Sequence, residues 1–89
     1  MIKIEYDPGK NQRNIKERGL SFDTVKDFEF DTALVWKDDR RDYGEVRYCA
    51  LGYIGLRIHH IVFTLRADVV RVISLRKANK REIKRYAED

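Results

Sequence analysis

Three segments in the second half of the chain have the composition of β-strands and are separated by very short turns. They cover residues 45–53, 56–65 and 69–75, with turns at Ile54-Gly55 and Ala67-Asp68. Turns this short join antiparallel neighbours, whereas parallel strands need a crossover of a dozen residues or more. The spacing therefore predicts an antiparallel sheet as the centre of the fold.

The first half of the chain predicts one strand and two helices. Residues 2–6 alternate apolar and polar side chains, as a half-buried strand does. Asp7 and Pro8 suit the N-cap and first position of a helix that ends at Gly19. A second helix is predicted to begin after Ser21. Its apolar side consists of Phe22, Val25 and Phe28.

The remaining segments complete the predicted order of elements. Residues 34–36 begin a strand that leads into a polar segment, Lys37 to Gly44, which we expect to be a mobile loop. Residues 79–87 predict a closing helix with Ile83, Tyr86 and Ala87 as its apolar stripe. The order β-α-α-β-β-β-β-α indicates one α+β domain spanning residues 1–89, with helices on one face of the sheet. The other face would be free to bind a partner.

Positive charge is concentrated towards the C-terminus. Residues 1–45 have a charge balance of −2, and residues 46–89 have a balance of +6. Such a surface favours an anionic partner, most simply the phosphates of RNA or DNA. The candidates for RNA binding are Arg71, Lys77, Lys80, Arg81, Lys84 and Tyr86. Tyr86 could stack on a base or anchor its helix to the sheet.

The composition excludes several classes of protein. A single cysteine, Cys49, allows no internal disulfide, and two histidines with one cysteine give no zinc-ligand spacing. No segment is long and apolar enough to span a membrane, and the N-terminus has no signal-peptide pattern. We therefore expect a cytoplasmic protein with no metal, no other cofactor and no membrane partner.

Five blocks of residues, in order along the chain, resemble the BrnT family of toxins. The blocks are Tyr6-Asp7-Pro8 with Lys10 and Asn14; Arg18-Gly19-Leu20-Ser21-Phe22; Tyr43-Gly44-Glu45 with Arg47 and Tyr48; His59 with Val62-Phe63-Thr64 and Arg66; and Arg71-Val72-Ile73-Ser74 with Arg76, Ala78, Glu82 and Tyr86. Many relatives have a Lys-His pair where this chain has Glu17-Arg18, so the first helix here offers no titratable histidine.

The resemblance implies a RelE-like fold and a ribonuclease that blocks translation. It also implies a BrnA-type antitoxin with a ribbon-helix-helix domain, which would neutralise the toxin and bind promoter DNA as part of a complex with it.

Metal-free RNA cleavage needs a base for the ribose 2′-hydroxyl, cations for the charged transition state and an acid for the 5′ oxygen. Arginine suits the second task because its fork donates two bonds to phosphate. Our candidates for the catalytic site are Arg66, Arg76, Arg47, Glu45 and His59. Flanking arginines would oppose a raised pKa at Glu45, which favours a role in positioning Arg47 over proton abstraction.

Two other functions fit the same residues. The first is a nucleic-acid- or protein-binding module that uses the basic sheet and helix but cleaves nothing. The second is a basic surface whose main role is to receive an acidic antitoxin tail.

Overall fold

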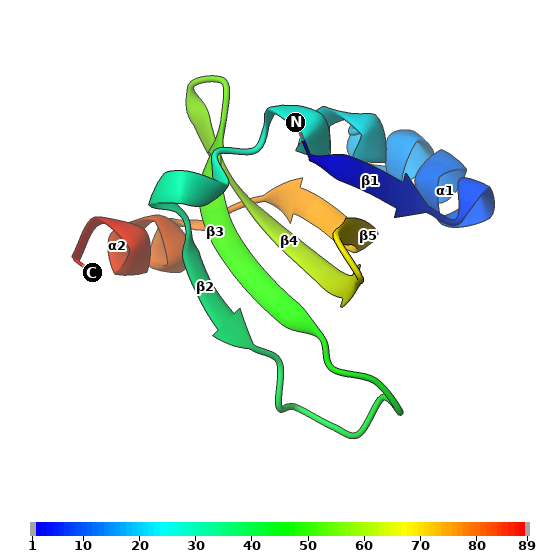
Figure 1. Cartoon of the computed structure of the whole chain (residues 1–89). Coiled ribbons are helices and arrows are strands. Elements are labelled where there is room, and N and C mark those ends of the chain that lie inside the picture. The colour runs from blue at the N-terminus through cyan, green and yellow to red at the C-terminus, as the bar shows by residue number, and fades with distance from the viewer. Residues whose placement is uncertain (1, 89) are drawn as a thin grey trace.

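The computed structural model describes residues 2–88. Its order of elements matches the predicted order (Figure 1). The elements are β1 (Lys3–Tyr6), α1 (Pro8–Arg18), the 3₁₀ helices η1 (Phe22–Asp27) and η2 (Phe30–Thr32), β2 (Leu34–Lys37), β3 (Tyr48–Ile54), β4 (Arg57–Arg66), β5 (Val69–Lys77) and α2 (Lys80–Glu88).

The five strands form one sheet in the order β1-β5-β4-β3-β2. The pairs from β2 to β5 are antiparallel, as predicted from the short turns. The prediction of a wholly antiparallel sheet is wrong at one edge, because β1 pairs with β5 in parallel. This contact joins the first strand to the last, and the long connection between them provides the crossover that parallel pairing requires.

The helix boundaries follow from local chemistry. The Asp7 carboxylate accepts a hydrogen bond from the Lys10 amide at 2.9 Å, and Gly19 ends α1 with a φ of 69°, in the left-handed region that glycine adopts without strain. Ser21 caps the next helix, as predicted. That helix is a pair of 3₁₀ segments and not one α-helix. Asn11 is buried and accepts a bond from the Phe22 amide at 2.8 Å, which ties α1 to η1.

The hydrophobic core lies on the face of the sheet that η1 and its neighbours cover, which we call the first face. Its buried members include Phe22, Val25, Phe28, Ala50, Ile61, Phe63, Val72 and Leu75. Gly52 is required here, because a Cβ atom at that position would lie 2.7 Å from the Phe28 ring. Burial of this apolar surface is the main source of the fold's stability.

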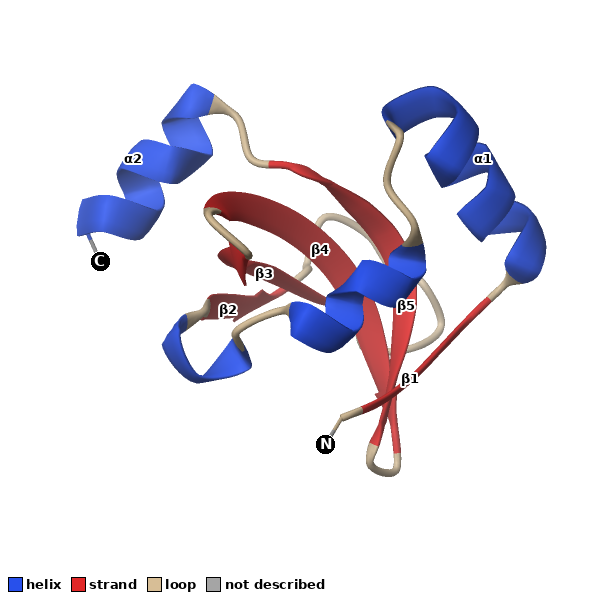
Figure 2. Ribbon diagram, turned by 90° about the horizontal axis from the view of Figure 1, so that it is seen from above, coloured by secondary structure: helices blue, strands red, loops and turns tan. Residues whose placement is uncertain are grey.

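The opposite surface, the second face, carries the side chains that alternate with the core residues along β3, β4 and β5. Helix α2 contacts this face, through Arg76 on β5 and Trp36 on β2. Figures 1 and 2 show α2 and α1 on opposite sides of the molecule, with the strands between them. The prediction that the helices share one face and leave the other free is therefore wrong, because α2 packs on the second face. Several side chains of this face are also buried, among them Cys49, Leu51, Val62 and Thr64.

Helix α2 begins with a reciprocal cap. The Asn79 side chain accepts a bond from the Glu82 amide at 2.8 Å, and the Glu82 carboxylate accepts one from the Asn79 amide at 3.0 Å. This is a capping box, which satisfies two otherwise unpaired amides. Ile83, predicted as part of the apolar stripe, is exposed.

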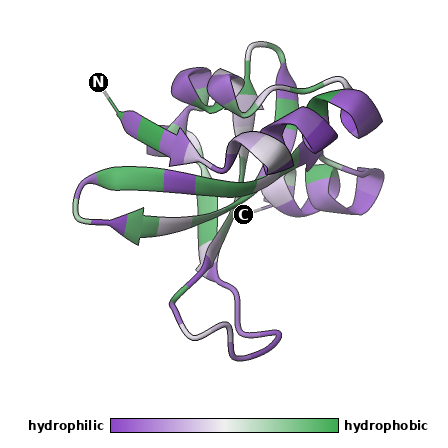
Figure 3. Cartoon of the chain, turned by 90° about the vertical axis from the view of Figure 1, so that its right-hand side faces the viewer, coloured by the Kyte–Doolittle hydropathy of each residue, from purple (hydrophilic) through white to green (hydrophobic). Residues whose placement is uncertain are grey.

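The segment between β2 and β3 is longer than predicted. The strand expected from Glu45 begins at Tyr48, so Glu45 and Arg47 belong to the connection. Its surface is mostly hydrophilic (Figure 3). The prediction of a strand from Glu45 is wrong for residues 45–47, because the pairing with β4 begins at Tyr48 and the Val46 side chain is exposed.

Candidate functional site

A groove of about 470 Å³ opens on the second face between α2 and the β2–β3 connection. Its lining comes from four strands or their flanks and from the first turn of α2. The lining residues are Trp36, Lys37, Asp38, Asp39, Arg40, Cys49, His60, Arg76 and Glu82. The sheet provides the floor, and two arginine–carboxylate pairs stand on either side of it.

The first pair joins Arg76 to Glu82. Two guanidinium nitrogens of Arg76 donate to the two carboxylate oxygens of Glu82, at 2.7 and 2.8 Å. These bonds lower the pKa of Glu82 to about 2, so this carboxylate is charged at neutral pH. A third bond, at 3.4 Å, goes to the Lys77 carbonyl. Two of the five guanidinium N–H groups of Arg76 therefore remain free of partners within residues 2–88.

The second pair joins Arg40 to Asp38. The Nε and one terminal nitrogen of Arg40 donate to the two Asp38 oxygens, each at 2.8 Å. The Asp38 side chain is only 1% exposed, whereas that of Arg40 is 73% exposed. Hydrogen bonding from Arg40 holds the pKa of Asp38 well below its usual range, although burial acts in the opposite direction. A buried carboxylate thus fixes an exposed guanidinium at the groove rim.

His60 lies on the groove floor, directly opposite Arg76 in the β4–β5 pairing. The residue is buried, and its Nδ1 has no hydrogen-bond partner within the described residues. Burial lowers the pKa of His60, and the charge of Arg76 acts in the same direction. The imidazole is therefore neutral at pH 7 and can accept a proton.

Trp36 lines the groove, and Arg85, which lines a second cavity along α2, contacts its ring. The Arg85 guanidinium carbon lies 4.2 Å from the centre of the Trp36 ring, a cation–π contact. The Trp36 ring also meets the His60 ring edge-on, with centroids 5.9 Å apart.

The predicted catalytic residues fall in different places. Of the five, Arg76 alone lines the groove. Arg76 lies opposite His60 on β4, and Arg66 lies six residues further along β4 than His60. The backbones of the two arginines are therefore on the order of 20 Å apart. Arg66 and Glu45 approach each other at 3.9 Å with both side chains substantially exposed. Such a pair has little effect on stability.

Arg47 and Arg71 do not line the groove, although Arg47 lines an adjoining pocket that shares Lys37, Asp38 and Asp39 with it. The Arg47 guanidinium carbon is 4.0 Å from the centre of the Tyr43 ring, and its Nε is buried with no partner in the described chain. Arg71 approaches Glu5 at 3.5 Å and sits opposite Thr64 on the second face. Both arginines therefore extend the basic surface beyond the groove.

His59 lies on the first face, since it alternates with His60 and precedes the core residue Ile61 by two positions. Its Nδ1 is 2.9 Å from the Arg57 carbonyl, and burial lowers its pKa. The structure does not bring His59 to the groove with Arg76.

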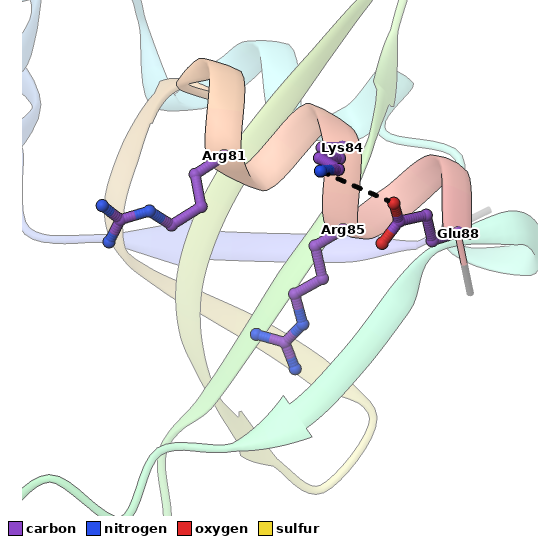
Figure 4. Close-up of a pocket in the computed structure, with 4 residues that line it drawn as sticks. All are labelled: Arg81, Lys84, Arg85 and Glu88. Carbon is purple, nitrogen blue, oxygen red and sulfur yellow. Dashed lines mark ion pairs between the residues drawn. The ribbon is translucent and has the colours of Figure 1, made fainter.

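The predicted RNA-binding residues of the C-terminal segment lie mostly in the open. Lys77, Lys80, Arg81 and Lys84 are exposed. A second cavity of about 480 Å³ lies along α2, where Arg81 and Arg85 project in different directions and Lys84 approaches Glu88 at 4.0 Å (Figure 4). Tyr86 donates a hydrogen bond to the Thr32 carbonyl at 3.0 Å and meets the Tyr53 ring edge-on, so it anchors the helix.

Sequence reasoning did not select His60, Arg40, Asp38 or Arg85 as site residues, and it treated Trp36 as a packing residue. Two patterns could have pointed to them. The parity of β4 separates His60 from the apolar Ile61 and Phe63, and the two-residue spacing of Asp38 and Arg40 suits a local ion pair in a turn.

Two further observations concern residues 2–88. No three histidine, cysteine, aspartate or glutamate side chains come together in a way that could hold a metal ion. No helix in this range is both long and apolar enough to cross a membrane.

Comparison with known proteins identifies the family. A family model described as the ribonuclease toxin BrnT of type II toxin-antitoxin systems matches residues 6–82. This range includes all the residues that line the groove. No match was found among curated proteins. The chain therefore belongs to the BrnT family of ribonuclease toxins of type II toxin-antitoxin systems.

Proposed function

We propose that this toxin cleaves RNA in the groove on the second face, without a metal ion. The observation that carries the proposal is the placement of a neutral histidine, His60, directly opposite Arg76, with Arg40 at the rim of the same groove. These side chains supply a proton acceptor and two cationic hydrogen-bond donors. They are two of the three kinds of group that metal-free RNA cleavage requires, the base and the cations, and solvent would supply the acid.

In the proposed reaction, His60 takes the proton of a ribose 2′-hydroxyl. The resulting oxygen attacks the adjacent phosphorus, and the bond to the 5′ oxygen breaks. The products are a 2′,3′-cyclic phosphate and a 5′-hydroxyl whose proton comes from solvent. The lowered pKa of His60 supports this role, because a base must be unprotonated at the working pH.

Arg76 and Arg40 would bind the scissile phosphate through the N–H groups that Glu82 and Asp38 leave free. Their ion pairs fix both guanidinium planes before RNA binds, and such preorganised donors stabilise developing charge most effectively.

The other basic residues would guide the RNA strand along the surface. Arg66, Arg71 and Arg47 would bind backbone phosphates on the second face, with Glu45 positioning Arg66. Lys77 and the exposed cations of α2 would continue this path. The exposed cations of α2 are Lys80, Arg81 and Lys84. All these basic residues would contribute affinity and not sequence selectivity, because they would contact phosphates only.

Membership of the family implies an antitoxin partner and an RNA substrate. We further propose that the antitoxin is of the BrnA type, that it covers the basic groove, and that the complex binds promoter DNA in the cytoplasm. The resemblance of the five sequence blocks supports this assignment.

Expression in a bacterium tests the proposed site. The wild-type chain should arrest growth with loss of RNA, and co-expression of the neighbouring open reading frame should relieve the arrest.

The His60→Gln variant should lose toxicity, and Arg76→Lys should be strongly impaired because lysine cannot form the guanidinium fork. His59→Gln is the matched control, since it changes the adjacent buried histidine on the other face, and it should remain toxic. Full toxicity of a folded His60→Gln variant would contradict the proposal.

RNA binding without cleavage is the second candidate function. It is favoured by the surroundings of His60, because burial and the charge of Arg76 both lower its pKa and so oppose the protonated imidazole that a base must become. Salt-sensitive RNA binding by the purified protein, with no product formed, would establish this candidate.

A further inference from the structure

Trp36 occupies an unusual place for a large aromatic residue. It lies on the edge strand β2, paired with Cys49, and its side chain lines the groove on the second face. It is only partly buried, and it does not belong to the hydrophobic core or to the partly buried side chains packed against that core. Its position is therefore not explained by core packing.

The cation above the Trp36 ring, the Arg85 guanidinium, also has no ion-pair partner within residues 2–88. Arg85 reaches Trp36 from α2, with its guanidinium carbon 4.2 Å from the ring centre. The guanidinium therefore lies over the indole ring, and its charge is not offset by a carboxylate in the described range. The indole also shares the groove with Arg76 and Arg40.

We propose that Trp36 and Arg85 form a stacking subsite for a nucleobase adjacent to the cleaved phosphate. Indole and guanidinium planes both stack on bases, and an aromatic platform accepts any base because each has a π-face. Trp36 shares the groove with Arg76, and its ring meets that of His60. A nucleotide whose phosphate lies at Arg76 therefore has its base within reach of Trp36. The inference rests on the proposed function, since it assigns a further contact to the same RNA.

Other aromatic residues near the groove have different roles. Tyr53 and Tyr86 pack edge-on against each other, and the Tyr86 hydroxyl donates to the Thr32 carbonyl. These contacts fix α2 to the rest of the molecule. Tyr43 also faces a cation, Arg47, but it does not line the groove, and its hydroxyl donates to Asp38. Among the aromatic side chains that line the groove within residues 2–88, Trp36 is the one whose ring lies against a cation.

The chain contains one tryptophan, so its fluorescence reports on this subsite directly. The probe is a short single-stranded 2′-O-methyl RNA containing all four bases, which lacks the attacking hydroxyl and cannot be cleaved. Inorganic polyphosphate is the control, because it carries similar charge without bases. We expect the RNA to quench the indole fluorescence and polyphosphate to leave it nearly unchanged.

Substitutions separate stacking from a structural effect. Trp36→Leu should weaken binding of the 2′-O-methyl RNA about 5- to 150-fold, corresponding to the ~1–3 kcal/mol of a base–aromatic stack. Trp36→Phe keeps a π-face and should recover most of the affinity. Neither change should alter the affinity for polyphosphate, which also shows that the groove is intact.

Two results would overturn the inference. One is equal quenching by polyphosphate and RNA. The other is unchanged RNA affinity in a Trp36→Leu variant that still binds polyphosphate. Because the probe is uncleavable, these results are independent of catalysis. If the wild-type protein cleaves RNA but the probe does not quench its fluorescence, the subsite alone is refuted. If the probe quenches the fluorescence but the protein does not cleave RNA, the proposed ribonuclease reaction alone is refuted.

Discussion

At the scale of single residues, the groove depends on carboxylates that orient arginines. Asp38 is almost completely buried, yet it stays charged because Arg40 donates two bonds to it. Burying a carboxylate costs free energy unless it is paired, so the pair is maintained by the fold. Its consequence is a guanidinium whose plane is fixed while most of its surface remains exposed.

We therefore expect Asp38→Asn to slow RNA cleavage by about 10- to 100-fold, the scale of a misplaced catalytic group. The reason is that Arg40 loses its fixed orientation. The measurement is the single-turnover rate of the purified protein. If Asp38 acts through Arg40, the double variant Asp38→Asn with Arg40→Gln should be no slower than Arg40→Gln alone. Additive losses would show that Asp38 has a separate role.

The two histidines make stability depend on pH. Burial is the main cause that lowers the pKa of His59 and of His60 below the ordinary value of 6.5. Above that value both are neutral in the folded and unfolded chains, and their effect on stability is constant. Below it, the unfolded chain binds protons more readily than the folded chain does. The free energy of unfolding therefore decreases as the pH decreases.

Thermal unfolding followed by circular dichroism between pH 8 and pH 5 tests this dependence. The midpoint should fall as the pH drops below about 6.5, the ordinary histidine pKa. The double variant His59→Gln with His60→Gln should show a smaller change over the same range. A wild-type midpoint that rises on acidification would contradict the account.

At the scale of elements, α2 is held to the sheet by few contacts. Glu82 combines two of them, since it closes the capping box with Asn79 and pairs with Arg76 on β5. The helix carries no buried residue. Its attachment to the second face therefore depends strongly on this one carboxylate.

Glu82→Gln should reduce the free energy of unfolding by about 1.5–3 kcal/mol, the range for hydrogen bonds to charged groups. Glu88→Gln is the matched control, because Glu88 lies on the same helix but is 66% exposed and approaches Lys84 only at 4.0 Å. That change should cost less than about 0.5 kcal/mol. Urea unfolding measures both, and equal effects of the two substitutions would refute the role assigned to Glu82.

The Glu82 pair also predicts a second loss of stability, at low pH. Its pKa is lowered from 4.5 to about 2, so its contribution is complete above 4.5 and disappears as the pH falls towards 2. The acid-induced decrease in this range should be smaller in Glu82→Gln. An identical acid profile for the two proteins would contradict the assigned pair.

How well an element could be predicted depended on how local its determinants are. The caps at Asp7 and Gly19 follow from neighbouring residues, and the structure confirms them. The turn predicted at Ile54-Gly55 lies one residue later, at Gly55-Leu56. The parallel β1–β5 pairing was missed because it joins the two ends of the chain. The faces of the β5 side chains could not be predicted either. A register shift at Val62/Phe63 puts Arg71 and Arg76 on one face, although they are five residues apart.

In the candidate site too, residues with local sequence signals were predicted and residues placed by tertiary contacts were not. Arg76 was selected from its family block and lines the groove. His59 was selected because it belongs to a family block, but it lies on the first face, whereas His60 lines the groove. The face of each histidine is set by strand register, which the sequence pattern does not give. Arg40 escaped notice because its role depends on the burial of Asp38, which no local pattern reveals.

At the scale of the whole molecule, cations border the groove and continue along α2, so RNA affinity should be strongly salt-dependent. If the surface binds about four phosphates, the log–log slope of affinity against salt should be near −3 for a single strand. Lys80→Gln with Lys84→Gln should make the slope less steep by about 0.7 for each phosphate that the variant no longer binds. A filter-binding series with uncleavable RNA measures it, and a slope near zero would exclude an electrostatic path along this surface.

The most direct test of the central claim is RNA cleavage by the purified chain in excess EDTA. We predict that the wild-type protein produces fragments with 2′,3′-cyclic phosphate ends. We also predict that His60→Gln and Arg76→Lys are each at least about 100-fold slower, the lower range for loss of acid–base catalysis, whereas His59→Gln is close to wild type. Cleavage abolished by EDTA, or a folded His60→Gln variant that cleaves at the wild-type rate, would contradict the assignment of this groove as a metal-independent ribonuclease site.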